Sequence, residues 1–233
     1  MFFRKITREL KKWKLQSNGK TALLIEGARR VGKSTVVEEF AKNEYRSYIL
    51  IDFAEAPLDI QELFSDTSNL DYIFLQLQLR YSVQLFERES LIIFDEVQLC
   101  PSARQAIKQL VKDGRYDYIE TGSLISIRKN IAHILIPSEE QRIQMRPMDY
   151  EEFLWAQGDE STFPLLGQTF TSKAALGEQL NRKLMRDFRL YMLVGGMPQA
   201  VDAYLQTNNL QVVDETKRMI IDLYEEDFYK ISP

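Results

Sequence analysis

Residues 27–35 read GARRVGKST, and their glycine, lysine and serine spacing matches a phosphate-binding loop. Glycines let the backbone curl so that successive N–H groups point at an anion, and the helix that follows adds its positive end. We expect Lys33 to reach the β- and γ-phosphates of a nucleotide, and Ser34 to bind magnesium through its hydroxyl. A chance match is disfavoured because an expected strand precedes the loop and an expected helix follows it. The predicted nucleotide contacts are Gly27, Ala28, Arg29, Arg30, Val31, Gly32, Lys33, Ser34 and Thr35.

A second group of polar residues ends the apolar run 91–94, which reads LIIF and continues into Asp95 and Glu96. Two acids at the end of a buried strand are costly unless they act at its exposed end. We expect Asp95 to hold magnesium together with Ser34, and Glu96 to be the general base that orients an attacking water. The alternative is a strand that merely runs into a polar turn. Downstream of a phosphate loop, the pair favours hydrolysis over phosphoryl transfer to a small molecule.

The third group is the end of the run 118–123, YIETGS, where two hydroxyls flank Gly122. If this strand lies beside the strand of the phosphate loop, Ser123 or Thr121 could hydrogen-bond the γ-phosphate or the water. The alternative is that Ser123 caps a helix beginning at Leu124. The local sequence leaves both interpretations open.

The elements that position these residues alternate between apolar runs and helical periodicity, which indicates an α/β domain with a mostly parallel sheet. The expected strands are 21–26, 47–53, 91–95, 116–121 and 142–145, and the expected helices are 2–15, 35–42, 59–88 and 102–113. Within 59–88 we expect the stripe Tyr72, Leu75, Leu79 and Val83 to pack inward.

The pattern changes near Pro147, after which only helical periodicity remains, at 149–157 and 175–230. Loops are expected at 161–164 and 207–209. We therefore predict a nucleotide-binding domain over 1–147 and a small helical lid over 148–233.

Composition fits an ordinary globular protein, with 45% apolar and 27% charged residues and a formal net charge of −4 over 233 residues. No global basic signature for nucleic acid is present. The single cysteine, Cys100, excludes an internal disulfide and suits a reducing compartment. Apolar runs are too short to cross a bilayer and no secretory signal is recognisable, so we expect a cytoplasmic protein without a membrane partner.

Charge is concentrated at the beginning of the chain, where residues 1–20 hold seven Lys or Arg against one acid, Glu9. This run could touch nucleic-acid phosphates or anionic lipid. We favour a solvated helix face, because several apolar residues recur at helical spacing and would pack inward. These residues are Phe2, Phe3, Ile6, Leu10 and Trp13.

Several arginines could complete the transition state of phosphoryl transfer, and none is distinguished by its local sequence. Arg128, Arg142 and Arg146 lie in the appropriate part of the chain, whereas Arg29 and Arg30 could face adenine or a partner. The lone histidine, His133, is interpreted as structural or exposed rather than as a ligand.

The chain resembles the bacterial and archaeal AAA-type P-loop ATPases that usually carry a C-terminal domain of unknown function. The resemblance rests on Trp13, on the Walker A loop GARRVGKST and on the Walker B segment LIIFDEVQ. It also rests on ETGSLISI (120–127), IPSEEQRIQMRPMDYEEFLWA (136–156), LVGGMPQAV (193–201) and DLYEEDFYK (222–230).

This resemblance implies an AAA+-like three-layer sandwich whose five-stranded sheet has the order 5-1-4-3-2, followed by a helical lid. It supports Ser123 or Thr121 as the sensor of the γ-phosphate. It also implies that Gly195, Gly196 and Pro198 shape a tight turn in the lid.

The sequence departs from the family pattern at Arg30, where many members have Gln, and before the fifth strand, where a Gly-Arg pair is missing. A catalytic arginine at that second place is therefore in doubt. Members commonly continue well past the segment near Tyr224, so we expect that a further C-terminal domain is absent from this chain.

Together these observations predict an ATPase that binds ATP or ADP with Mg²⁺, hydrolyses ATP slowly in isolation, and couples hydrolysis to movement of the lid. One alternative is a nucleotide-gated switch or scaffold with slow turnover. Another is an ATPase associated with nucleic acid, prompted by the basic run. A homo-oligomer and a protein partner are compatible with either, and a small-molecule kinase is disfavoured by Glu96.

Overall fold

The computed structural model describes residues 2–123 and 139–231, which form two compact units. The sheet unit comprises Ile6–Met145, and the helical unit comprises Met1–Lys5 together with Arg146–Pro233. None of the helices in these described ranges combines the length and apolarity that a bilayer crossing needs.

The sheet unit contains five strands, which all pair in parallel in the order β2-β3-β4-β1-β5. This is the expected order 5-1-4-3-2 counted from the other edge, so the α/β fold is confirmed. The strands are β1 (Ala22–Gly27), β2 (Ser47–Asp52), β3 (Ser90–Asp95), β4 (Asp117–Ser123) and β5 (Glu140–Met145). Because all carboxyl ends lie at one edge, the ends of β1, β3 and β4 are brought together there.

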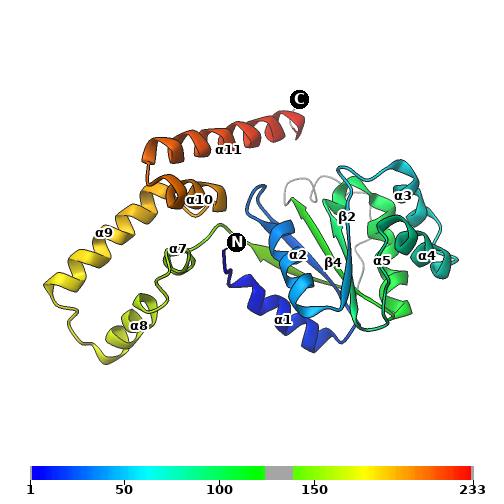
Figure 1. Ribbon diagram of the computed structural model, residues 1–233, viewed down its shortest axis with the longest axis horizontal. Coiled ribbons are helices and arrows are strands. Elements are labelled where there is room, and N and C mark those ends of the chain that lie inside the picture. Colours follow the sequence, from blue (N-terminus) through cyan, green and yellow to red (C-terminus); the bar gives the residue numbers. More distant parts are fainter. Residues whose placement is uncertain (1, 124–138, 232–233) are drawn as a thin grey trace. The chain divides into compact units, whose positions relative to one another are not determined.

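Helices cover both faces of the sheet, which explains why the central strands are apolar without alternation. On one face Leu23 and Ile25 pack with the helices α1 (Ile6–Ser17) and α2 (Lys33–Glu44). On the other face Leu24 and Phe94 pack with α3 (Leu58–Glu62), the 3₁₀ turn η1 (Leu63–Ser65), α4 (Leu70–Tyr81) and α5 (Pro101–Asp113). Figure 1 shows α2 and α5 on opposite sides of the strands.

The region expected as one helix over 59–88 is interrupted, because Asn69 caps a new helix and its side chain accepts a hydrogen bond from the Tyr72 amide. The expected inward stripe is wrong for α4. Tyr72, Leu75 and Leu79 are 53%, 51% and 66% exposed. The buried residues are Ile73, Phe74 and Leu77. Helix α4 carries two overlapping apolar stripes. Packing against the sheet buries the stripe of Ile73, Phe74 and Leu77.

The helical unit contains α7 (Tyr150–Ala156), α8 (Thr162–Ser172), α9 (Glu178–Val194), α10 (Pro198–Thr207) and α11 (Leu210–Ile231). A capping box between Asp149 and Glu152 begins α7. Helix α8 replaces the loop expected at 161–164, because Pro164 stands in the first turn, where its missing N–H costs nothing. The core of this unit includes Met148, Phe153, Val194, Val201 and Val213.

The beginning of the chain differs from the expected helix over 2–15, since α1 begins at Ile6. Phe2 packs against the core of the helical unit, and the Phe3 ring lies 5.3 Å from the Trp155 ring. The Arg4 guanidinium is buried, where it pairs with Glu152 at 3.2 Å. Phe2, Phe3 and Arg4 are therefore held by the helical unit. Leu10 and Trp13 are buried in the sheet unit as expected.

Candidate functional site

The phosphate-type loop connects the end of β1 at Gly27 with the beginning of α2 at Lys33. Gly32 has φ 93°, a left-handed conformation that favours glycine. A Cβ at Gly27 would lie 2.5 Å from the Met145 carbonyl oxygen, so only glycine fits the approach of β5. Arg30 also adopts a positive φ, 64°, without being glycine. The backbone at Gly27 and Gly32 therefore requires glycine, as the glycine spacing of the loop indicated.

Lys33 is buried, and its ammonium donates hydrogen bonds to the carbonyl oxygens of Gly27 at 3.2 Å and Ala28 at 3.1 Å. Burial lowers the pKa of Lys33, and the nearby carboxylates of Glu96 and Asp95 oppose that shift. The ammonium is therefore held by loop carbonyls, within the electrostatic influence of Asp95, which ends β3, and of Glu96, which follows it.

Asp95 connects three elements at the carboxyl edge of the sheet. Its Oδ1 accepts a hydrogen bond from the Ser34 hydroxyl at 2.9 Å and another from the Thr121 hydroxyl. The hydroxyls of Ser34 and Thr121 belong to α2 and β4, whereas Asp95 ends β3. The Asp95 carboxylate and the Ser34 hydroxyl are both hard oxygen ligands, and they lie next to each other. Mg²⁺ commonly binds few protein groups and keeps water or phosphate as its other ligands. The pair Ser34 and Asp95 therefore fits magnesium.

Glu96 directly follows β3 and has a left-handed backbone, with φ 51° and ψ 45°. Its amide donates to the Thr121 hydroxyl at 3.4 Å, and its carboxylate oxygen Oε2 accepts from the Gln98 side-chain amide. Gln98 was not among the residues predicted from sequence. The only signal in the sequence was that Gln98 is a polar residue in the otherwise apolar turn that follows Asp95 and Glu96.

Ser123 is the last residue of β4 and is aligned with Gly27 of β1. Of the two hydroxyls considered as sensors, Thr121 contacts Asp95, and Ser123 lies beside the first residue of the loop. The helix that Ser123 was expected to cap, beginning at Leu124, lies outside the described residues, as do Arg128 and His133.

The remaining loop residues differ in exposure. Ala28, Arg29, Arg30 and Thr35 are exposed, whereas Val31 is buried in the core of the sheet unit. Of the other arginines, Arg142 has side-chain partners, whereas Arg146 is contacted at its backbone carbonyl. Arg142 pairs with Glu140 at 2.7 Å and lies 3.9 Å from Glu26. The Arg146 carbonyl accepts a hydrogen bond from Arg4.

A buried charged cluster lies on the opposite face of β4 from Thr121. Glu120 is fully buried, and burial together with the neighbouring Glu140 carboxylate raises its pKa well above the ordinary value. Arg104 of α5 pairs with Glu140 at 3.3 Å, and both side chains are buried. The strand that carries Thr121 and Ser123 is therefore backed by ionisable groups that do not face the loop.

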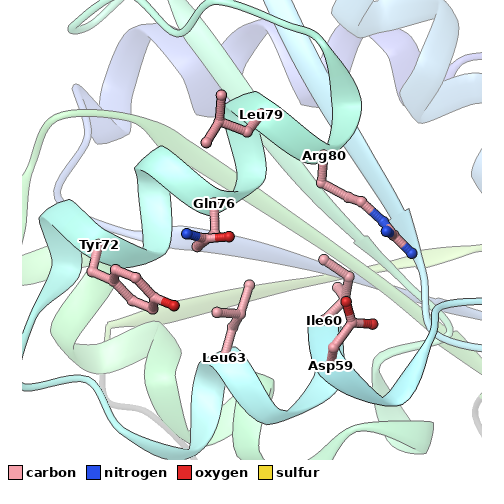
Figure 2. A pocket seen from close by; sticks show the side chains of 7 residues that line it. All are labelled: Asp59, Ile60, Leu63, Tyr72, Gln76, Leu79 and Arg80. Atoms are coloured by element: carbon pink, nitrogen blue, oxygen red, sulfur yellow. The ribbon is translucent and has the colours of Figure 1, made fainter.

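A pocket of about 370 Å³ lies on the α3–α4 side of the sheet unit (Figure 2). Figure 2 shows the side chains that line it, which come from α3, η1 and α4. These residues are Asp59, Ile60, Leu63, Tyr72, Gln76, Leu79 and Arg80. No residue of the phosphate loop or of the β3 and β4 ends belongs to it, so it is distinct from the candidate nucleotide site.

The basic run at the beginning of the chain makes several ion pairs within its own units. Lys5 contacts Asp149 and Glu151 at 2.6 Å each in the helical unit. In the sheet unit Lys11 lies 2.8 Å from Glu44, and Lys14 stacks 4.0 Å above the Tyr45 ring. Part of this positive charge is therefore neutralised inside the protein, which supports the interpretation as a helix face.

Comparison with known proteins places these features in a family. A family model described as AAA domain matches residues 19–154, and one described as a domain of unknown function (DUF8612) matches residues 185–233. No curated protein matches the sequence.

One solved structure shows the same fold at low identity, and two others are similar with lower TM-scores. The Walker-type ATPase PABY2304 of Pyrococcus abyssi is 19% identical, with a TM-score of 0.55, over 100% of this chain and 77% of that one. The Aeropyrum pernix Orc1 protein in complex with DNA is 11% identical over 94% and 66%, with a TM-score of 0.47. PCH-2 of C. elegans is 11% identical over 92% and 69%, also with a TM-score of 0.47.

Proposed function

The chain belongs to the AAA domain family, and from this premise we propose that it hydrolyses ATP to ADP and phosphate with magnesium. The observation that carries the proposal is the 2.9 Å contact between the Ser34 hydroxyl and Asp95, with Glu96 as the next residue. It unites a phosphate loop, a pair of metal ligands and a potential base at one edge of the sheet.

In the proposed complex, the loop amides between Gly27 and Lys33 bind the phosphates, and α2 contributes the positive end of its dipole. The Lys33 ammonium exchanges its carbonyl partners, Gly27 and Ala28, for β- and γ-phosphate oxygens. This exchange is favourable because the anionic oxygens are stronger acceptors than the carbonyls.

Ser34 and Asp95 would hold the magnesium, which supplies charge neutralisation at the phosphates when it is bound. Glu96 accepts a proton from the water that attacks the γ-phosphorus, and the bond from that phosphorus to the bridging oxygen of ADP breaks. Thr121 and Ser123 are the candidate sensors of the γ-phosphate. We further propose that hydrolysis drives movement of the helical unit, as the lid of this ATPase.

The test compares phosphate release and binding of a fluorescent ATP analogue in the wild type, Glu96→Gln and Lys33→Ala. Glu96→Gln should bind the analogue normally and lose at least about a hundredfold in turnover, because the base is removed. Lys33→Ala should lose binding itself. Unchanged hydrolysis in Glu96→Gln would refute the assigned role. Protein that carries ADP and releases no phosphate at steady state would instead be a nucleotide-gated switch.

Turnover should also be measured against protein concentration, with and without DNA. A steep concentration dependence would show that the site is completed between subunits of a homo-oligomer. Stimulation by DNA that is lost with added salt would support the nucleic-acid alternative.

A further inference from the structure

Gln98 is a buried side chain that lies two residues beyond the candidate base, in the 3₁₀ turn η2 (Val97–Leu99) between β3 and α5. Its amide nitrogen donates a hydrogen bond to Oε2 of Glu96. An amide N–H can only donate, so Oε2 of Glu96 is the acceptor in this contact.

The backbone around this contact is held at both ends. The Glu96 carbonyl accepts from the Leu99 amide at 3.0 Å, and the Val97 carbonyl accepts from Cys100 at 3.1 Å. The Glu96 amide in turn approaches the Thr121 hydroxyl at 3.4 Å. The left-handed conformation of Glu96 is unfavourable for a residue with a Cβ, so these bonds must maintain it.

Glutamate has a flexible side chain, and its carboxylate would otherwise sample several orientations at the end of β3. A donor fixed on Oε2 restricts that rotation while Oε1 stays available as an acceptor. Gln98 is neutral, so it adds no charge next to the nucleotide phosphates. These properties suit a group that orients a base without competing for its proton.

We propose that Gln98 is a positioning residue for hydrolysis, which acts through Glu96 and makes no contact with the nucleotide. The inference rests on the proposed ATPase function. It assigns Oε2 of Glu96 to Gln98 and Oε1 to the attacking water. Without the amide, the carboxylate loses its orientation.

The test uses Gln98→Met, which keeps the length and loses the donor, and Gln98→Glu, which replaces the donor by an acceptor. Both should lower kcat by about tenfold to a hundredfold, since a small misplacement of a reacting group has effects of that size. Gln98→Glu should have the larger effect because two carboxylates repel each other. The Kd of a fluorescent ATP analogue should stay within about twofold in both.

Gln61→Met is the matched control, because Gln61 donates an amide hydrogen bond to the Ala56 carbonyl at 3.0 Å and is not part of the site. Its kcat should equal that of the wild type. Wild-type kcat in both Gln98 variants would overturn the inference, and so would a parallel loss of analogue binding and thermal stability. A wild type that releases no phosphate from ATP at steady state would instead refute the proposed ATPase function.

Discussion

The Thr121 hydroxyl donates a hydrogen bond to the Asp95 carboxylate, although the two residues are 26 positions apart. Parallel pairing of β3 with β4 produces this contact, because it aligns Phe94 with Glu120 and directs the following side chains to the same face. The same oxygen of Asp95 accepts from Ser34. Asp95 thus links the phosphate-type loop to the strand that carries both sensor candidates.

The first prediction concerns Thr121→Val, which keeps the shape of the side chain and removes its hydroxyl. We expect the free energy of unfolding to fall by about 1.5–3 kcal/mol, because the hydrogen bond to a charged group is lost. Hydrolysis should need more Mg²⁺ for half-maximal rate, since Asp95 is held by Ser34 alone. Urea unfolding and a magnesium titration measure the two effects. Thr121→Ser, which retains the hydroxyl, should behave much more like the wild type; equal behaviour of the two variants would contradict the prediction.

The second prediction concerns Arg30, whose φ of 64° is unfavourable for a residue with a Cβ. Arg30→Gly should raise the free energy of unfolding by up to about 1 kcal/mol, because the left-handed conformation costs glycine little. Arg30→Val should lower it, since a β-branched residue fits this conformation worst. Thermal unfolding of both variants measures the difference. The same stability in both would show that the loop does not hold residue 30 in this conformation.

The third prediction concerns the pH dependence caused by Glu120, whose pKa is raised well above its usual 4.5 by burial and by Glu140. As the pH rises above 4.5, the unfolded chain releases this proton while the folded protein retains it. The contribution of Glu120 to stability is therefore full below that pH and is lost as the pH rises through the folded pKa.

Glu120→Gln, which cannot ionise, should remove this part of the pH dependence. Urea unfolding between about pH 5 and pH 9 should give a flatter profile for the variant than for the wild type. Identical slopes in the two proteins would mean that Glu120 is already ionised in the folded state.

The fourth prediction concerns Gly196, in the turn between α9 and α10. A Cβ there would lie 2.1 Å from the Met148 carbonyl oxygen, and the Gly196 carbonyl accepts from the Met148 amide at 2.7 Å. Gly196→Ala should destabilise the helical unit by about 1–3 kcal/mol, because the backbone must move. Gly167→Ala is the control, since a Cβ in α8 meets nothing within 4 Å. Gly167→Ala should raise the free energy of unfolding by about 0.5–1 kcal/mol. A stability change of the same sign in both variants would contradict the close contact at Gly196.

The sequence by itself determined the residues of the loop and the identity of the acids. Glycine spacing sets the backbone from Gly27 to Lys33, and short apolar runs mark strands that end at Asp95 and Thr121, the second of which continues to Ser123 in the structure. Both signals are local, since each depends on residues that are neighbours in the chain. The strand order came from the family resemblance, and the observed pairing confirms it.

Only the tertiary structure decided which side chains meet. The contact between Thr121 and Asp95 depends on the register of β3 and β4. The contact between Gln98 and Glu96 depends on the left-handed backbone of Glu96, which residue propensities do not predict. Packing also chose the buried face of α4, because that helix is apolar on more than one side. Contacts between distant residues follow from how the elements pack, which a local pattern does not encode.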